Sequence, residues 1–180
     1  MTVGTEETRL IVIRGNSASG KSSIAAGLRG RFGRNLAVVG QDNLRRDVLR
    51  ERDRPGAANI GLIGLTARYA LDAGFHTVVE GILYADRYAA MLTDLVREHR
   101  GVSRCYYLDV PLTETVARHA TKGAACLSRV TEDHLRDWYR EQDLLPGGLE
   151  TVIDASSTLA DSVTRIMRES GLDRIPPVDR

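Results

Sequence analysis

Residues 15–22 read GNSASGKS, in which two glycines, a lysine and a serine stand at a fixed spacing. Gly15 and Gly20 allow the backbone to curl, so that successive N–H groups point at one anion. Lys21 places a cation beside phosphate oxygens, and the Ser22 hydroxyl is a ligand for Mg²⁺. An apolar run precedes this segment and a helix-like stretch follows it, which is the context that the pattern G-x-x-x-x-G-K-[ST] requires. We therefore expect a phosphate loop that binds ATP (or GTP) with Mg²⁺.

The predicted nucleotide site extends beyond the lysine and the serine of this loop. The helix that follows contributes its free N–H groups and its dipole, and two cations from the second half of the chain are expected to meet the same phosphates. The predicted nucleotide-binding residues are Gly15, Asn16, Ser17, Ala18, Ser19, Gly20, Lys21, Ser22, Ser23, Arg118 and Lys122. A Gly/Ser-rich turn that binds nothing is the alternative.

A carboxylate follows the second apolar run of the chain. Asp42 comes just after the run 35–40, at the edge of the sheet where α/β proteins bind ligands. Such a carboxylate can orient an attacking hydroxyl and accept its proton, and Arg45 would face the same pocket one helical turn later. The alternative role for Asp42 is that of an N-cap for a helix starting near Asn43. Both roles are compatible.

A second carboxylate, Glu80, ends the run HTVVE and is followed by Gly81. Its position at the end of a buried strand would bring it to the same edge, beside the phosphate loop. There it would hold a Mg²⁺-bound water or a hydroxyl of the phosphate acceptor, unless it is a glutamate at the edge with no role. We expect the acceptor to contact Asp42, Arg45, Glu80 and the helix 57–73.

A cation-bearing segment at 118–130 is predicted to close over the phosphates as a lid. Pro111 opens a helix after the apolar run 104–110, and Arg118 and Lys122 fall on one face of that helix. Small residues then provide a hinge, which a lid over a transferring phosphoryl group needs. An ordinary helical hairpin with solvated cations is the alternative.

The rest of the sequence alternates between strand-like and helix-like segments. Short runs rich in Val, Ile, Leu and Tyr are typical of strands buried on both faces of a parallel sheet. The predicted strands are 9–14, 35–40, 76–80, 104–110 and 150–154. The predicted helices are 22–32, 60–74, 85–101 and 158–170, with others after Pro111 and near Thr131. Leu62, Leu65 and Tyr69 mark the helical spacing of 60–74. This alternation predicts a three-layer α/β fold.

Length and composition narrow the class of protein. A chain of 180 residues, 42% of them hydrophobic, suits a single domain at 1–180, with a frayed tail at about 172–180. A net charge of +1 argues against a polynucleotide or a membrane surface as partner. The N-terminus lacks a secretory pattern, no apolar run approaches a membrane span, and the cysteines and histidines show no disulfide or metal-ligand pattern. We expect a cytoplasmic protein, monomeric or homodimeric.

Two short strings bear on whether a γ-phosphate is transferred or only hydrolysed. TKGA at 121–124 lacks the aspartate of the element with which GTPases read guanine, and DRPG at 53–56 does not end a strand. A hydrolysing switch also has no need of a base such as Asp42 directed at an alcohol. An NTP-hydrolysing regulatory switch or a nucleotide-binding partner protein therefore stays the alternative.

These features together resemble the small P-loop kinases. GNSASGKS is similar to the Ser-rich loop of chloramphenicol phosphotransferase, VVEG at 78–81 to a strand end of zeta toxins, and DNLR at 42–45 to the D-x-x-R of polynucleotide kinases. Gluconate and shikimate kinases belong to the same group, and the similarity covers about 9–170. The resemblance implies a P-loop NTPase fold with a five-stranded sheet in the order 2-3-1-4-5, helices on both faces and a small helical lid.

The resemblance also implies roles for four residues. Lys21 and Ser22 would hold phosphate and Mg²⁺, Asp42 would be the base, and Arg118 would be the lid cation. The near-neutral charge departs from polynucleotide kinases, which present a basic groove, although a polynucleotide or nucleoside 5′-hydroxyl stays a third possibility. The function predicted from the sequence is ATP-dependent transfer of the γ-phosphate to a hydroxyl of a small metabolite or antibiotic-like molecule.

Overall fold

The computed structural model describes residues 2–121, 123 and 130–176. Its centre is a five-stranded sheet in the order β2-β3-β1-β4-β5, in which every neighbouring pair is parallel. The strands are β1 (Arg9–Gly15), β2 (Leu36–Gly40), β3 (His76–Glu80), β4 (Val102–Asp109) and β5 (Glu150–Asp154). The predicted order is confirmed. Because all five strands point the same way, the loops after them meet at one edge of the sheet.

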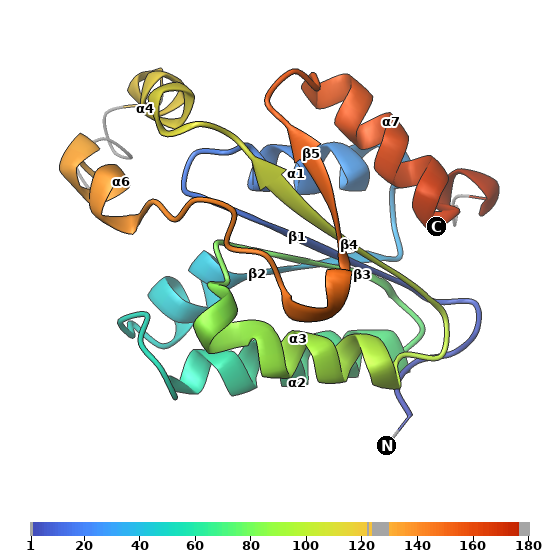
Figure 1. The fold of residues 1–180 in the computed structure, drawn as a ribbon. Helices are drawn as coiled ribbons and strands as arrows, with labels where there is room; N and C mark the ends of the chain where they lie inside the picture. Colours follow the sequence, from blue (N-terminus) through green and yellow to red (C-terminus); the bar gives the residue numbers. More distant parts are fainter. Residues whose placement is uncertain (1, 122, 124–129, 177–180) are drawn as a thin grey trace.

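Helices cover both faces of this sheet (Figure 1). One face carries α1 and α7, and the other carries α2 and α3, while α4 and α6 lie near the carboxyl end of β4. The α-helices are α1 (Lys21–Phe32), α2 (Ala58–Asp72), α3 (Ala85–Glu98), α4 (Leu112–Ala120), α6 (Glu132–Trp138) and α7 (Leu159–Ser170). The described part of the chain contains no helix that is both long and apolar enough to cross a membrane.

Two hydrophobic cores result from the alternation of side chains along the strands. Leu10 and Val12 of β1 face α2 and α3, whereas Ile11 and Ile13 face α1 and α7. All four side chains are fully buried, as expected for a strand whose two faces are both covered. The sheet is therefore a rigid base for the loops at its carboxyl edge.

The helix expected at 60–74 is present as α2, but two of the residues that marked its spacing do not face the core. Leu65 and Tyr69 are 67% and 78% exposed, and the helix packs instead through residues one or two positions away. The buried residues of α2 are Asn59, Ile63, Gly64, Ala67, Ala70 and Leu71. Small side chains on this face allow close packing, since a Cβ at Gly64 would lie only 3.1 Å from Met91 of α3. The buried face therefore follows Ile63, Ala67, Ala70 and Leu71, which also stand at helical spacing.

Three further segments differ from the prediction or lie partly outside the described residues. The helix expected after Asp42 is a short π-helix (Asn43–Val48). The prediction of a frayed tail from about residue 172 is wrong at its start. Leu172–Arg174 form a 3-10 helix, and Leu172 is buried in the core beside α1 and α7. Helix α4 ends within the predicted lid at 118–130, and α6 begins just after it. Lys122 and residues 124–129 of this lid lie outside the described residues.

Candidate functional site

The phosphate loop joins the end of β1 to the start of α1. Gly15 has a φ of 143° and Gly20 a φ of 106°, a region of backbone space that L side chains rarely adopt. A Cβ at Gly15 would also lie 2.7 Å from the carbonyl oxygen of Leu108. The two glycines are therefore required by the path of the loop. The strand, loop and helix stand in the order that the motif predicts.

Lys21, the first residue of α1, folds back over the loop. Its Nζ donates to the carbonyl oxygen of Asn16 at 2.6 Å and to the Ser19 hydroxyl at 3.3 Å. Lys21 also lines a pocket of about 540 Å³ together with Ser22 and Ser23. The ammonium group therefore lies inside the curve of the backbone, as expected of a cation that meets β- and γ-phosphates.

Ser22 and Glu80 meet at the carboxyl edge of the sheet. The Ser22 hydroxyl donates to Glu80 Oε2 at 3.1 Å. Gly40 is the register partner of Glu80, and a Cβ at Gly40 would lie 3.0 Å from Glu80 Oε1, so the glycine leaves room for the carboxylate. Burial raises the pKa of Glu80 above its ordinary value, and the Lys21 charge and the Ser22 hydrogen bond offset only part of this effect.

The geometry of this pair fits a Mg²⁺ site. A serine hydroxyl and a carboxylate are hard oxygen ligands, and Mg²⁺ usually takes one or two such protein groups together with substrate phosphates and waters. The 3.1 Å contact shows that both oxygens reach one point next to the phosphate loop. Among the described residues, no cluster of three or more His, Cys, Asp or Glu side chains could hold a metal.

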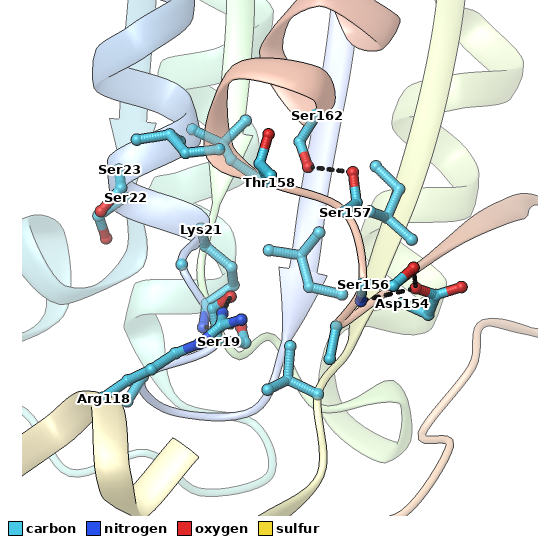
Figure 2. Close-up of a pocket in the computed structure, with 18 of the residues that line it drawn as sticks. Ser19, Lys21, Ser22, Ser23, Arg118, Asp154, Ser156, Ser157, Thr158 and Ser162 are labelled. Carbon is cyan, nitrogen blue, oxygen red and sulfur yellow. Dashed lines mark hydrogen bonds between the residues drawn. The ribbon is translucent and has the colours of Figure 1, made fainter. Parts of the chain in front are cut away.

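Arg118 reaches the phosphate loop from α4. Its Nη1 donates to the carbonyl oxygen of Ser19 at 3.0 Å, across 99 residues of sequence, and its Nη2 pairs with Glu114 one turn earlier. Figure 2 shows the Arg118 side chain extending toward Ser19 and Lys21. The structure therefore brings Arg118 to the phosphate loop, while Lys122, predicted to act with it, lies outside the described residues.

The loop after β5 forms the opposite wall of the same pocket (Figure 2). Asp154 accepts hydrogen bonds from the backbone N–H and the hydroxyl of Ser156, and the Ser157 and Ser162 hydroxyls lie 2.9 Å apart. Small polar side chains of residues 154–158 therefore line the same pocket as Lys21.

Asp42 is held by two arginines. Its Oδ1 accepts from Arg45 Nη2 at 3.0 Å and lies 3.0 Å from Arg46 Nε, while its side chain is 66% exposed. Asp42 occupies the N-cap position of the π-helix that follows, but its side chain forms no capping hydrogen bond there. Burial is the main cause of the raised pKa of Glu80, and the Asp42 charge adds a smaller contribution in the same direction.

A buried polar network fixes the strand end from which Asp42 projects. Gln41 Nε2 donates to the Tyr88 hydroxyl at 2.8 Å, and Gln41 Oε1 accepts from the Leu83 N–H at 3.2 Å. The Tyr88 hydroxyl lies 2.7 Å from Asp53 Oδ1, and Arg87 pairs with the same carboxylate. Asp53, the first residue of the string DRPG, therefore fastens the loop before α2 to α3.

Sequence reasoning missed a buried arginine and its two carboxylates. Arg14 of β1 is 0% exposed and forms ion pairs with Asp143 at 3.0 Å and Glu150 at 2.9 Å. Its Nε also donates to the carbonyl oxygen of Leu83 at 2.8 Å. The sequence did contain a signal for this cluster. Arg14 stands within a strand predicted to be buried on both faces, and a buried charge needs a partner. The partners lie too far along the chain to be read from spacing.

The loop, its glycines and the parallel sheet define a P-loop NTPase fold. The chain belongs to the AAA_33 family, described as an AAA domain, which matches residues 10–145. No curated protein sequence matches the chain.

Solved structures of low sequence identity share the fold. APS kinase from Mycobacterium tuberculosis, in complex with AMPPNP and APS, has a TM-score of 0.68 and 18% identity, over 97% of this chain and 100% of that chain. A gluconokinase from Sinorhizobium meliloti 1021 has a TM-score of 0.58 and 17% identity, over 95% and 92% of the two chains. The tunicamycin resistance protein of Deinococcus radiodurans has a TM-score of 0.59 and 17% identity, over 92% and 96%.

Proposed function

We propose that this protein is an ATP-dependent phosphotransferase that moves the γ-phosphate to a hydroxyl of a small metabolite or antibiotic-like molecule. The observation that carries the proposal is the convergence of Lys21, Arg118 and the Ser22–Glu80 pair on one loop. A phosphoryl group in transfer carries its charge on three equatorial oxygens, and catalysis depends mainly on positioning and on charge stabilisation. Two cations and two oxygen ligands around one loop provide both.

Each residue of the site would have a distinct role in the transfer. The loop N–H groups and Lys21 would hold the triphosphate, and Arg118 would stabilise the charge that develops as the γ-phosphoryl group leaves. Ser22 and Glu80 would hold Mg²⁺, which when bound neutralises phosphate charge. Asp42 would orient the acceptor hydroxyl and take its proton as the new P–O bond forms, with ADP as the leaving group.

The acceptor side favours a small molecule. Asp42, Arg45 and Glu80 lie at or beyond the ends of two neighbouring strands, and the net charge of +1 supports no extended contact with a polynucleotide. Fold neighbours named as APS kinase, gluconokinase and tunicamycin resistance protein suggest candidate acceptors. We therefore choose APS, gluconate, tunicamycin, aminoglycosides, phenicols, nucleosides and sugars as the first panel.

The test is ATP consumption, with ³²P transfer, measured without an acceptor and with each member of the panel. We expect slow turnover alone and an increase of many fold with the right alcohol, and loss of transfer by about 10²–10³-fold in a folded Lys21→Ala variant. Turnover that no alcohol increases, with phosphate passing only to water, would instead support a hydrolysing switch. Normal transfer by folded Lys21→Ala would exclude the proposed site.

A further inference from the structure

Asn16, the second residue of the phosphate loop, forms a two-bond contact with the backbone of Arg140. Asn16 Nδ2 donates to the Arg140 carbonyl oxygen at 2.8 Å, and Asn16 Oδ1 accepts from the Arg140 N–H at 2.9 Å. The two residues are 124 positions apart in the sequence, and Asn16 is buried. Separating them would break the hydrogen bond between the Arg140 N–H and the buried Asn16 Oδ1, so the contact holds residue 140 against the loop.

The same residue contacts the phosphate-loop cation. The backbone carbonyl of Asn16 accepts from Lys21 Nζ at 2.6 Å. Under the proposed function, this ammonium group interacts with the β- and γ-phosphates, so its charge is shared between the phosphates and the Asn16 carbonyl. Any change in the position of Lys21 on nucleotide binding therefore acts directly on Asn16.

Residues 138–140 in turn contact the beginning of α3. The Tyr84 hydroxyl donates to the Trp138 carbonyl oxygen at 2.6 Å. The Arg140 guanidinium lies 4.0 Å from the centroid of the Tyr84 ring and pairs with Asp86 at 3.0 Å. Tyr84 precedes α3 directly and follows the strand end that carries Glu80. Segment 138–140 thus connects α6, the phosphate loop and the acceptor side of the sheet edge.

We propose that Asn16 is a positioning residue that couples nucleotide binding at the phosphate loop to segment 138–140, and through that segment to Tyr84 and Asp86 at the start of α3, the helix that follows the strand end with Glu80. The proposal rests on the proposed function. Asn16 performs this role with its side chain, so any contact of Asn16 with phosphate comes from its backbone N–H. The reaction gains from this link because the two substrates must be aligned within a fraction of an ångström.

Trp138 is the only tryptophan of the chain, which makes the link measurable by intrinsic fluorescence. Its ring stacks on His134 with the centroids 5.1 Å apart and the planes 6° from parallel. AMPPNP–Mg²⁺ is titrated into the protein, its binding is measured separately by calorimetry, and Trp138 emission is compared at saturation. We expect a change in emission in the wild type and loss of most of that change in Asn16→Ala.

Arg140→Ala is the matched control. It removes the guanidinium but keeps the backbone N–H and carbonyl groups that Asn16 contacts, so the response of Trp138 to AMPPNP–Mg²⁺ should persist. Because Asn16→Ala could fold poorly, amide exchange of residues 139–143 in the wild type gives a second measurement. Exchange there should slow when AMPPNP–Mg²⁺ binds.

The outcomes separate this proposal from the proposed function. Failure of the wild type to bind AMPPNP–Mg²⁺ would overturn both. Binding that leaves Trp138 emission and the exchange at 139–143 unchanged would overturn the coupling alone. A purely structural role for Asn16 would lower the melting temperature of Asn16→Ala while the Trp138 response stayed at its wild-type size, and this result would also overturn the coupling.

Discussion

The Ser22 hydroxyl and the Glu80 carboxylate, 58 residues apart in the sequence, are joined by a hydrogen bond of 3.1 Å at the carboxyl edge of the sheet. Ser22 belongs to the first turn of α1 and Glu80 to the last position of β3. The pairing of β1 with β3 places them side by side, since Ile13 of β1 is the register partner of Glu80. The first turn of α1 and a half-buried carboxylate thus meet at one position in the fold.

The raised pKa of Glu80 predicts a dependence of stability on pH. Burial favours the neutral carboxyl group, so this group stabilises the fold below the ordinary pKa of 4.5 and loses that contribution as pH rises through the raised value. Glu80→Gln stays neutral throughout. We expect Glu80→Gln to be about as stable as the wild type near pH 4 and increasingly more stable than it above pH 4.5, measured by urea unfolding across pH.

The same variant should lose activity as it gains stability. An amide is a poor ligand for Mg²⁺, so transfer should fall by roughly 10–100-fold and need more Mg²⁺ for saturation. Glu132→Gln, on the exposed side of α6 and paired with Arg136, is the control and should leave both properties unchanged. Full activity of Glu80→Gln at wild-type Mg²⁺ would remove Glu80 from the metal site.

Asp42→Asn tests the proposed base. Asparagine keeps the size of the side chain and one oxygen that can accept from Arg45, but it loses the charge and the basicity. We expect normal binding of ATP–Mg²⁺ and a loss of about 10²-fold or more in transfer, measured with the acceptor that the panel identifies. Hydrolysis of ATP without an acceptor should barely change. Normal transfer by this variant would move the search for the base to Glu80.

Arg118→Ala tests the cation that α4 brings to the loop. Its charge would matter most as the γ-phosphoryl group departs, so kcat should fall by about 10²–10³-fold while the KM for ATP changes little. Arg136→Ala is matched to it, because Arg136 forms a similar i, i+4 pair with Glu132 on α6. That variant should keep wild-type kinetics. A similar effect of both changes would indicate only a loss of helix stability.

Arg14→Leu should be strongly destabilising. It leaves Asp143 and Glu150 without their buried cation, and breaking a buried ion pair from one side costs about 3–5 kcal/mol. Adding Asp143→Asn and Glu150→Gln should restore much of the loss, since neutral amides still accept from the backbone N–H groups of Ala85 and Leu145. Urea unfolding of the single and triple variants measures both effects. If the triple variant recovered no stability, the unpaired carboxylate charges would not be the cause of the loss in Arg14→Leu.

The phosphate loop and the sheet could be predicted from the sequence. The loop residues 15–22 are contiguous, so spacing alone indicates their chemistry, and the apolar runs of the strands are local in the same way. The strand order came from a resemblance rather than from the letters, and it is confirmed. The carboxyl-edge positions of Asp42 and Glu80 followed from where their strands end.

Only the tertiary structure decided how distant residues pair. The contact of Asn16 with Arg140 and the ion pairs of Arg14 join positions more than a hundred residues apart, and no local pattern records them. The close approach of Gly64 in α2 to Met91 in α3 likewise depends on how the two helices pack. Local periodicity determines which elements form, whereas packing and the need to pair every buried charge and amide determine how those elements meet.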